Sequence, residues 1–117
     1  KLMTIERLHS GPRMSQAVIH NGLVYLAGQI GAPGEDTAAQ TRAVLDKIDA
    51  LLAEGGTDKS HVLTATIWLA DMSDFGAMNE IWDQWVGGAN APARATGEVK
   101  LATPDYRVEI IITAALP

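Results

Sequence analysis

Arg94 is a candidate ligand-binding residue, because it lies in a short strand predicted over residues 94–100. Alternation along that strand places Arg94, Thr96 and Glu98 on one face. A guanidinium keeps its charge and offers a fork of N–H donors that matches a carboxylate, so Arg94 could clamp a small organic anion. The residues leave an ordinary alternative open, in which Arg94 forms a structural salt bridge with Glu98 or Glu109.

The last predicted strand, residues 106–114, alternates between apolar and mixed positions. The apolar set predicts a core face and consists of Val108, Ile110, Ile112 and Ala114. The opposite set is polar enough to contribute to a site and consists of Arg107, Glu109, Ile111 and Thr113. We therefore expect the candidate site on the face of the sheet away from the core.

Other familiar kinds of site lack their sequence patterns. No HxH or HExxH spacing joins the three histidines, so no metal site is expected. None of the serines lies in a nucleophile elbow, and Ser73 is expected to cap a helix that begins at Asp74. The turn from Gly28 to Gly31 is not a GxGxxG motif. It could present backbone N–H groups to a ligand, or it could be a plain connecting loop.

Hydrophobic periodicity and turn residues predict the elements that position these residues. Asn21-Gly22 predicts a tight hairpin between strands over 16–20 and 23–27, after a first strand over 2–8. Thr37 and Gln40 fit a capping box at the start of an amphipathic helix that Gly55-Gly56 ends. A strand over 61–70, a helix from 74 to Gly87-Gly88, and strands over 94–100 and 106–114 joined by a turn through Pro104-Asp105 complete the chain.

This order, β-β-β-α-β-α-β-β, predicts an α+β fold with a mixed β-sheet and two helices packed on one face. A length of 117 residues, 47% of them hydrophobic, indicates a single domain over 1–117. So short a chain has no further element for the other sheet face, and self-association is the expected cover.

Composition excludes several classes of partner. A net charge of −5 without a basic cluster argues against nucleic acid, and no apolar run approaches the length of a membrane span. The chain has no cysteine, which excludes disulfides and fits a reducing compartment, so a cytoplasmic location is expected. Lys1 and Leu2 are expected to be an added remnant before a natural start at Met3.

Four segments together resemble the Rid (reactive intermediate deaminase, or YjgF) family in order and spacing, and most of all its YoaB-type branch. These segments are residues 24–30, 65–75, 78–82 and 91–96. The resemblance implies a chorismate-mutase-like fold, assembled as a homotrimer with three clefts between subunits. It also implies hydrolysis, without a cofactor, of 2-imino or 2-enamino acids of the 2-iminobutanoate or 2-iminopropanoate type to 2-oxo acids and ammonia.

In this family the residue matching Arg94 holds the substrate carboxylate. The resemblance places six further residues in the cleft: Met14, Ile30, Gly31, Asn79, Thr96 and Ile111. Three of them depart from the family pattern, because Met14 replaces a tyrosine, Thr96 a cysteine and Ile111 a water-positioning glutamate. Glu109, two residues before Ile111 on the same strand face, is an alternative carboxylate.

Three other functions compete with deamination. A non-catalytic module that binds a 2-oxo acid through Arg94 would explain the departures. Chorismate-mutase chemistry would need more cationic donors around its dianionic substrate, and the ribonuclease activity sometimes attached to the family conflicts with the acidic charge balance.

Overall fold

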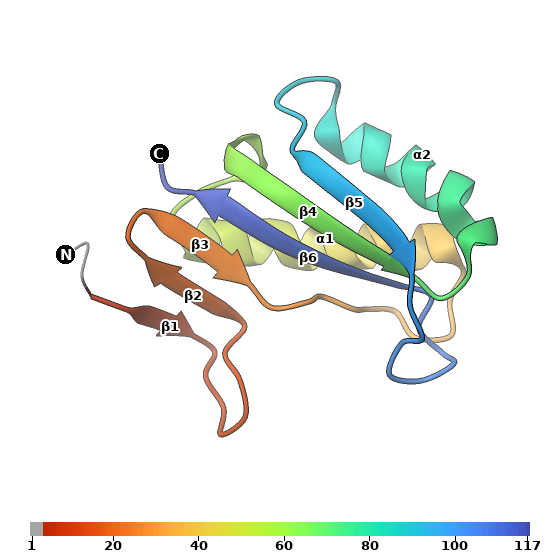
Figure 1. The fold of residues 1–117 in the computed structure, drawn as a ribbon, viewed down its shortest axis with the longest axis horizontal. Helices are drawn as coiled ribbons and strands as arrows, with labels where there is room; N and C mark the ends of the chain where they lie inside the picture. Colours follow the sequence, from red (N-terminus) through yellow and green to blue (C-terminus); the bar gives the residue numbers. More distant parts are fainter. Residues whose placement is uncertain (1–3) are drawn as a thin grey trace.

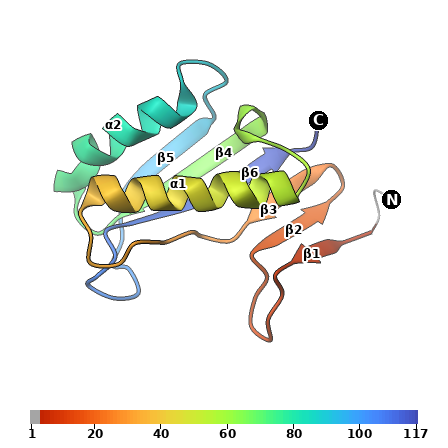
Figure 2. The same ribbon diagram turned by 180° about the vertical axis from the view of Figure 1, so that it is seen from behind.

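A computed structural model describes residues 4–117, which form one mixed six-stranded sheet with two helices on one of its faces. Figure 1 looks onto the open face, with α1 behind the strands, and Figure 2 looks from behind onto the helix layer. The predicted element order and the placement of both helices are confirmed. Within residues 4–117, no helix has both the length and the apolar character that a membrane span requires.

The first three strands form an antiparallel meander: β1 (Glu6–Leu8), β2 (Ala17–His20) and β3 (Leu23–Leu26). Asn21 and Gly22 have φ of 56° and 83°, so the predicted hairpin turn is confirmed. The first strand is shorter than predicted, and the predicted start at Leu2, like Met3, lies outside the described residues.

The other strands are β4 (Val62–Leu69), β5 (Ala93–Glu98) and β6 (Val108–Ala115). The sheet order is β1-β2-β3-β6-β4-β5, with β4 antiparallel to β6 and parallel to β5. The last two strands are therefore not neighbours, because β4 lies between them. This topology makes β5 an edge strand, so one side of the strand that carries Arg94 is open for a ligand or another chain.

The first helix, α1 (Thr37–Glu54), begins one residue earlier than predicted. Asp36 is its N-cap, and Oδ1 of Asp36 accepts a 2.8 Å hydrogen bond from the Ala39 N–H. The predicted capping role of Thr37 is wrong, because a carboxylate one residue earlier already accepts the free N–H group. At the other end, Gly56 adopts φ of 90°, so the predicted left-handed stop falls on the second glycine of the pair.

The second helix, α2 (Phe75–Val86), follows a 3₁₀ turn, η2 (Met72–Asp74). The prediction that Ser73 caps this helix is wrong: the Ser73 N–H donates to Oδ1 of Asp71, which caps the turn instead. The helix ends at Gly87, with φ of 71°, as predicted. A second 3₁₀ turn, η1 (Lys59–His61), precedes β4.

The hydrophobic core lies between the two helices and the inner face of the sheet. Alternation in β6 is regular, and Val108, Ile110 and Ile112 are fully buried. Ile48 and Leu52 of α1 and Met78 of α2 pack into the same cluster. The opposite face of the sheet has no helix over it, and Tyr25 on that face is 43% exposed.

Candidate functional site

Arg94 lies on the exposed edge strand and is held by side chains of α2. Its Nη1 donates a 2.7 Å hydrogen bond to Oδ1 of Asn79. The guanidinium carbon lies 5.6 Å from the ring centre of Trp82 and 5.8 Å from that of Phe75, within the range of cation–π attraction. An amide and two aromatic rings orient the cation without neutralising its charge, which leaves it able to attract an anion.

The salt-bridge alternative for Arg94 is not borne out. Glu98 uses Oε1 to accept a 3.0 Å hydrogen bond from the Met72 N–H, so it fastens η2 to the edge strand. Glu109 lies in β6, beyond β4. Across residues 4–117, no Asp or Glu oxygen lies within 4.0 Å of an Arg94 nitrogen.

The prediction that Arg94 and Glu109 share the open face of the sheet is wrong. The register pairs Arg94 with Ala65 and Thr96 with Ile67, two buried residues of the helix-bearing face. Ile111 pairs with Thr66 and Glu109 with Trp68, on the open face. Alternation identifies residues that share a side of one strand, but it does not tell which side of the sheet that is. In an edge strand the inner side can be polar where a helix end lies over it.

Thr96, two residues after Arg94, carries a buried hydroxyl with no hydrogen-bond partner. Such groups are rare in folded proteins, because a buried polar atom without a partner costs about 1–3 kcal/mol. The hydroxyl is closed off from the surface in this conformation, so a ligand could reach it only after a rotation about χ1. Thr96 therefore costs stability at the same edge of the sheet where Arg94 lies exposed.

Glu109 lies against the backbone of Gly28 on the open face. A Cβ placed on residue 28 would lie 2.0 Å from Oε2 of Glu109, so a larger residue at position 28 would displace the Glu109 carboxylate. Removal from water raises the pKa of the Glu109 carboxyl. Gly28 was considered for its backbone N–H, but its contact with Glu109 was not predicted from the sequence. The available signal was a glycine directly after the predicted strand over 23–27, where the backbone can come close to another segment.

Ile30 and Gly31 lie on the other side of this segment. The Ile30 carbonyl accepts a 2.7 Å hydrogen bond from Nζ of Lys47, and a Cβ on Gly31 would lie 3.3 Å from the Cβ of Ala43. Both contacts are with α1, on the helix-bearing side. The structure therefore places Gly28 next to a carboxylate, that of Glu109, and Gly31 next to the ammonium group of Lys47.

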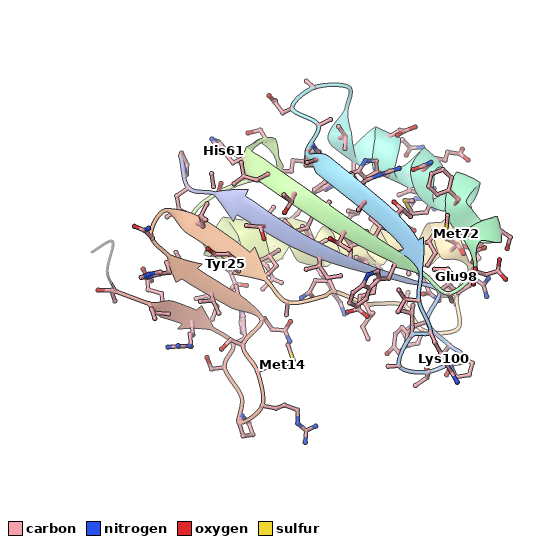
Figure 3. All side chains as sticks on the ribbon, viewed as in Figure 1. Met14, Tyr25, His61, Met72, Glu98 and Lys100 are labelled. Carbon is pink, nitrogen blue, oxygen red and sulfur yellow. The ribbon has the colours of Figure 1, made fainter. Side chains whose placement is uncertain are left out.

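Met14 lies on the loop between β1 and β2, where its side chain is 48% exposed. Its carbonyl accepts a hydrogen bond from the Gly11 N–H, which closes this loop on itself. Figure 3 shows Met14 below the hairpin, well apart from Glu98 at the end of β5 and from Met72 in η2. Within one chain, Met14 cannot contact a ligand held at that strand.

The predicted residues thus fall into two groups within one chain. The edge group lies between β5 and α2 and consists of Asn79, Arg94 and Thr96. Ile111, together with Glu109, lies on the open face, and Met14, Ile30 and Gly31 lie in loops near β2 and β3. In the part of the chain that the structure describes, no three His, Asp or Glu side chains gather as metal ligands would.

Comparison with known proteins matches this arrangement to one family. A family model described as Endoribonuclease L-PSP matches residues 4–116. The chain belongs to this family. It is 46% identical over 114 residues to the "RutC family protein YoaB" of Escherichia coli, covering 97% of this chain and 100% of that protein. It is 47% identical over 114 residues to a "RutC family protein" of Haemophilus influenzae, covering 96% and 98% of the two chains.

A solved structure from Neisseria meningitidis, described as a member of the YjgF protein family, has the same fold. Its TM-score is 0.96 at 49% identity, and the match covers 100% of this chain and 98% of the other. A member of the YjgF/YER057c/UK114 family from Mycobacterium tuberculosis matches with a TM-score of 0.89 at 31% identity, covering 97% and 100%. The predicted membership of the Rid (YjgF) family and the resemblance to YoaB are confirmed.

Proposed function

We propose that this protein hydrolyses reactive 2-imino or 2-enamino acids to 2-oxo acids and ammonia, with Arg94 holding the substrate carboxylate. The observation that carries the proposal is the state of Arg94, which is exposed, oriented by Asn79 and two aromatic rings, and paired with no carboxylate within residues 4–117. Family membership supports the same chemistry.

The reaction needs little machinery beyond orientation of the substrate and a proton carrier. Water adds to the electrophilic carbon of the C=N bond, which forms a C–O bond and places a proton on nitrogen. The hydroxyl proton is then transferred to the nitrogen, the C–N bond breaks as the C=O bond forms, and ammonia and a 2-oxo acid are released. A carboxylate fixed on Arg94 would hold the carbon next to it in place, so that a positioned water attacks from one direction.

Glu109 is our candidate for the proton carrier. The family pattern has a glutamate at the position of Ile111, and Glu109 would take over the role of that glutamate. Ile111 has no titratable group, whereas Glu109 lies on the same face against the bare backbone of Gly28. Burial shifts the pKa of Glu109 toward neutral pH. A carboxyl group with such a pKa can both accept a proton and return it.

The two groups of residues would complete one site only if they came from neighbouring copies of the chain. We propose a homotrimer in which the edge group of one subunit, around Arg94, faces the Met14, Gly28 and Glu109 region of the next. The uncovered sheet face supports this assembly, because it exposes apolar side chains that a neighbour would bury. A light-scattering mass equal to three chains is expected, and a single-chain mass at micromolar concentration would exclude the intersubunit cleft.

A binding module without catalysis is the second candidate. The loss of the family's tyrosine at Met14 favours it, because a side chain that could carry a proton is replaced by an apolar one. The same Arg94 would then hold a 2-oxo acid as the final ligand.

One experiment separates the two functions. An amino-acid oxidase generates 2-imino acids in solution, and their disappearance is measured with and without the protein. Deaminase function predicts faster loss of the imine with the unchanged protein and no acceleration with Arg94→Ala. Pyruvate binding without any acceleration would support the binding module, and the absence of both would exclude the proposal.

A further inference from the structure

We infer that Asp74 and Arg107 form a positioning pair, which fixes the start of α2 so that Asn79 and Phe75 hold Arg94 ready for its ligand. Every side chain that orients Arg94 belongs to α2. The direction of the guanidinium therefore depends on how α2 is placed against the edge strand. This inference rests on the proposed role of Arg94 as an anion clamp.

Arg107 joins three elements at one point. Its Nε lies 2.7 Å and its Nη2 2.5 Å from Oδ2 of Asp74, the residue immediately before α2. The same Nε lies 3.2 Å from Oγ1 of Thr37, the first residue of α1. The Arg107 N–H donates at 2.8 Å to Oε1 of Gln40.

Gln40 extends the network into two loops. Its Nε2 donates to the carbonyls of Glu35 and Asp105, each at 2.9 Å. Gln40 is fully buried and Thr37 is 4% exposed, so these partners cannot easily be replaced by water. The Asp74 side chain is 18% exposed, which shields its attraction to Arg107 from solvent. The start of α2 is therefore tied to α1 and to the segment before β6.

A second contact at the same end supports a positioning role. Glu98 of β5 accepts the Met72 N–H, which fastens η2 to the strand that carries Arg94. With Glu98 on one side and Arg107 on the other, the turn before Phe75 is held from two directions. The two arginines thus differ in role: Arg107 is engaged by Asp74, whereas Arg94 has only uncharged partners among the described residues.

The test uses Asp74→Ala and Arg107→Met, with Thr57→Val as a control of stability. Thr57 is 8% exposed and donates a partly buried 2.7 Å hydrogen bond to the Ala115 carbonyl, at the far end of β6 from Arg107. Its loss should destabilise the fold without moving the start of α2. Arg107→Lys, which restores the charge, should recover part of the effect.

Two measurements are made on each variant. The first is the affinity for pyruvate, which should weaken roughly 3- to 30-fold in Asp74→Ala and in Arg107→Met, as expected for coupled neighbours in one network. The double variant should bind pyruvate no more weakly than either single variant, and Thr57→Val should bind it normally.

The second measurement is the NMR signal of the Arg94 Nε–H, assigned by its absence in Arg94→Lys. The Phe75 and Trp82 rings should shift this signal in the unchanged protein, and the shift should diminish when the pair is broken.

The NMR measurement requires no ligand, so it separates the two proposals. If the unchanged protein fails to bind pyruvate, the clamp fails, while the Arg94 signal still tests the positioning pair. If both variants lose thermal stability but keep the Arg94 signal and the pyruvate affinity of the unchanged protein, the pair is structural only and the inference is overturned.

Discussion

Arg94 reaches from the edge strand to Asn79 on α2, and the 2.7 Å hydrogen bond between them uses only one nitrogen of the guanidinium. Nε and Nη2 remain as a second pair of donors. Asn79 thereby fixes the plane of the guanidinium and leaves its charge in place. This arrangement suits a carboxylate that arrives from outside the chain better than one supplied by the fold.

Arg94→Ala should abolish most of the affinity for 2-oxo acids and leave the fold nearly as stable as before. A charge-assisted bidentate contact is worth enough for a loss of roughly 30- to 1000-fold in affinity. Arg94→Lys keeps the charge but not the fork, so its loss should be smaller. Titration calorimetry with pyruvate and thermal unfolding of the same samples measure both effects.

Arg42→Ala is the matched control for this prediction, because Arg42 is an exposed arginine of α1 that lies beside Gln84 and Trp85 of α2 rather than on the strand that carries Arg94. It removes an equal charge and should leave the affinity unchanged. Unaltered pyruvate binding in Arg94→Ala would eliminate the clamp.

Thr96→Val should stabilise the protein. The substitution removes a buried hydroxyl that lacks a partner, so the free energy of unfolding should rise by about 1 kcal/mol. Thr96→Ser keeps the hydroxyl and serves as the control. Urea denaturation checks the stability, and a fall in stability of Thr96→Val would mean that the hydroxyl has a partner in the assembled protein.

Asp36→Ala should cost about 1 kcal/mol, the usual loss when a helix N-cap is removed. Thr37→Ala should also destabilise the protein, but through Arg107, whose Nε loses a hydrogen-bond acceptor. The two losses should be distinguishable by combining each with Arg107→Met. Under denaturation, Asp36→Ala should remain additive in that background, whereas Thr37→Ala should lose much of its effect.

Local signals predicted the elements well because each rests on contacts near in sequence. Asn21-Gly22 formed its turn, and Gly87 ended α2. The capping error at Thr37 came from two adjacent residues that can both accept a helix N–H, of which Asp36 is used. Such a choice depends on the exact path of the loop, which the sequence does not display.

The site was harder to predict because it depends on contacts between distant segments. Arg94 was found from its type and from the family resemblance, but its position on the helix-bearing face follows from β5 pairing with β4 rather than with β6. The contact of Gly28 with Glu109 was not predicted, because the two residues lie 81 positions apart in the sequence. Periodicity within a strand contains no information about either relationship.

Glu109 should give the proposed reaction and the fold opposite dependences on pH. Because burial raises its pKa above the ordinary value, the folded chain holds the proton more tightly than the unfolded chain does. The contribution of Glu109 to stability is therefore best below the unfolded pKa and is lost as the pH rises through the folded pKa. If ionised Glu109 activates the water, imine hydrolysis should instead rise with pH through that same folded pKa.

Glu109→Gln should flatten both profiles and lower the rate at neutral pH, while pyruvate binding at Arg94 persists. Rate and thermal stability are measured across the acidic range for the two proteins. A Glu109→Gln variant with the rate and pH profile of the unchanged protein would remove Glu109 from the mechanism and leave Arg94 as a binding residue alone.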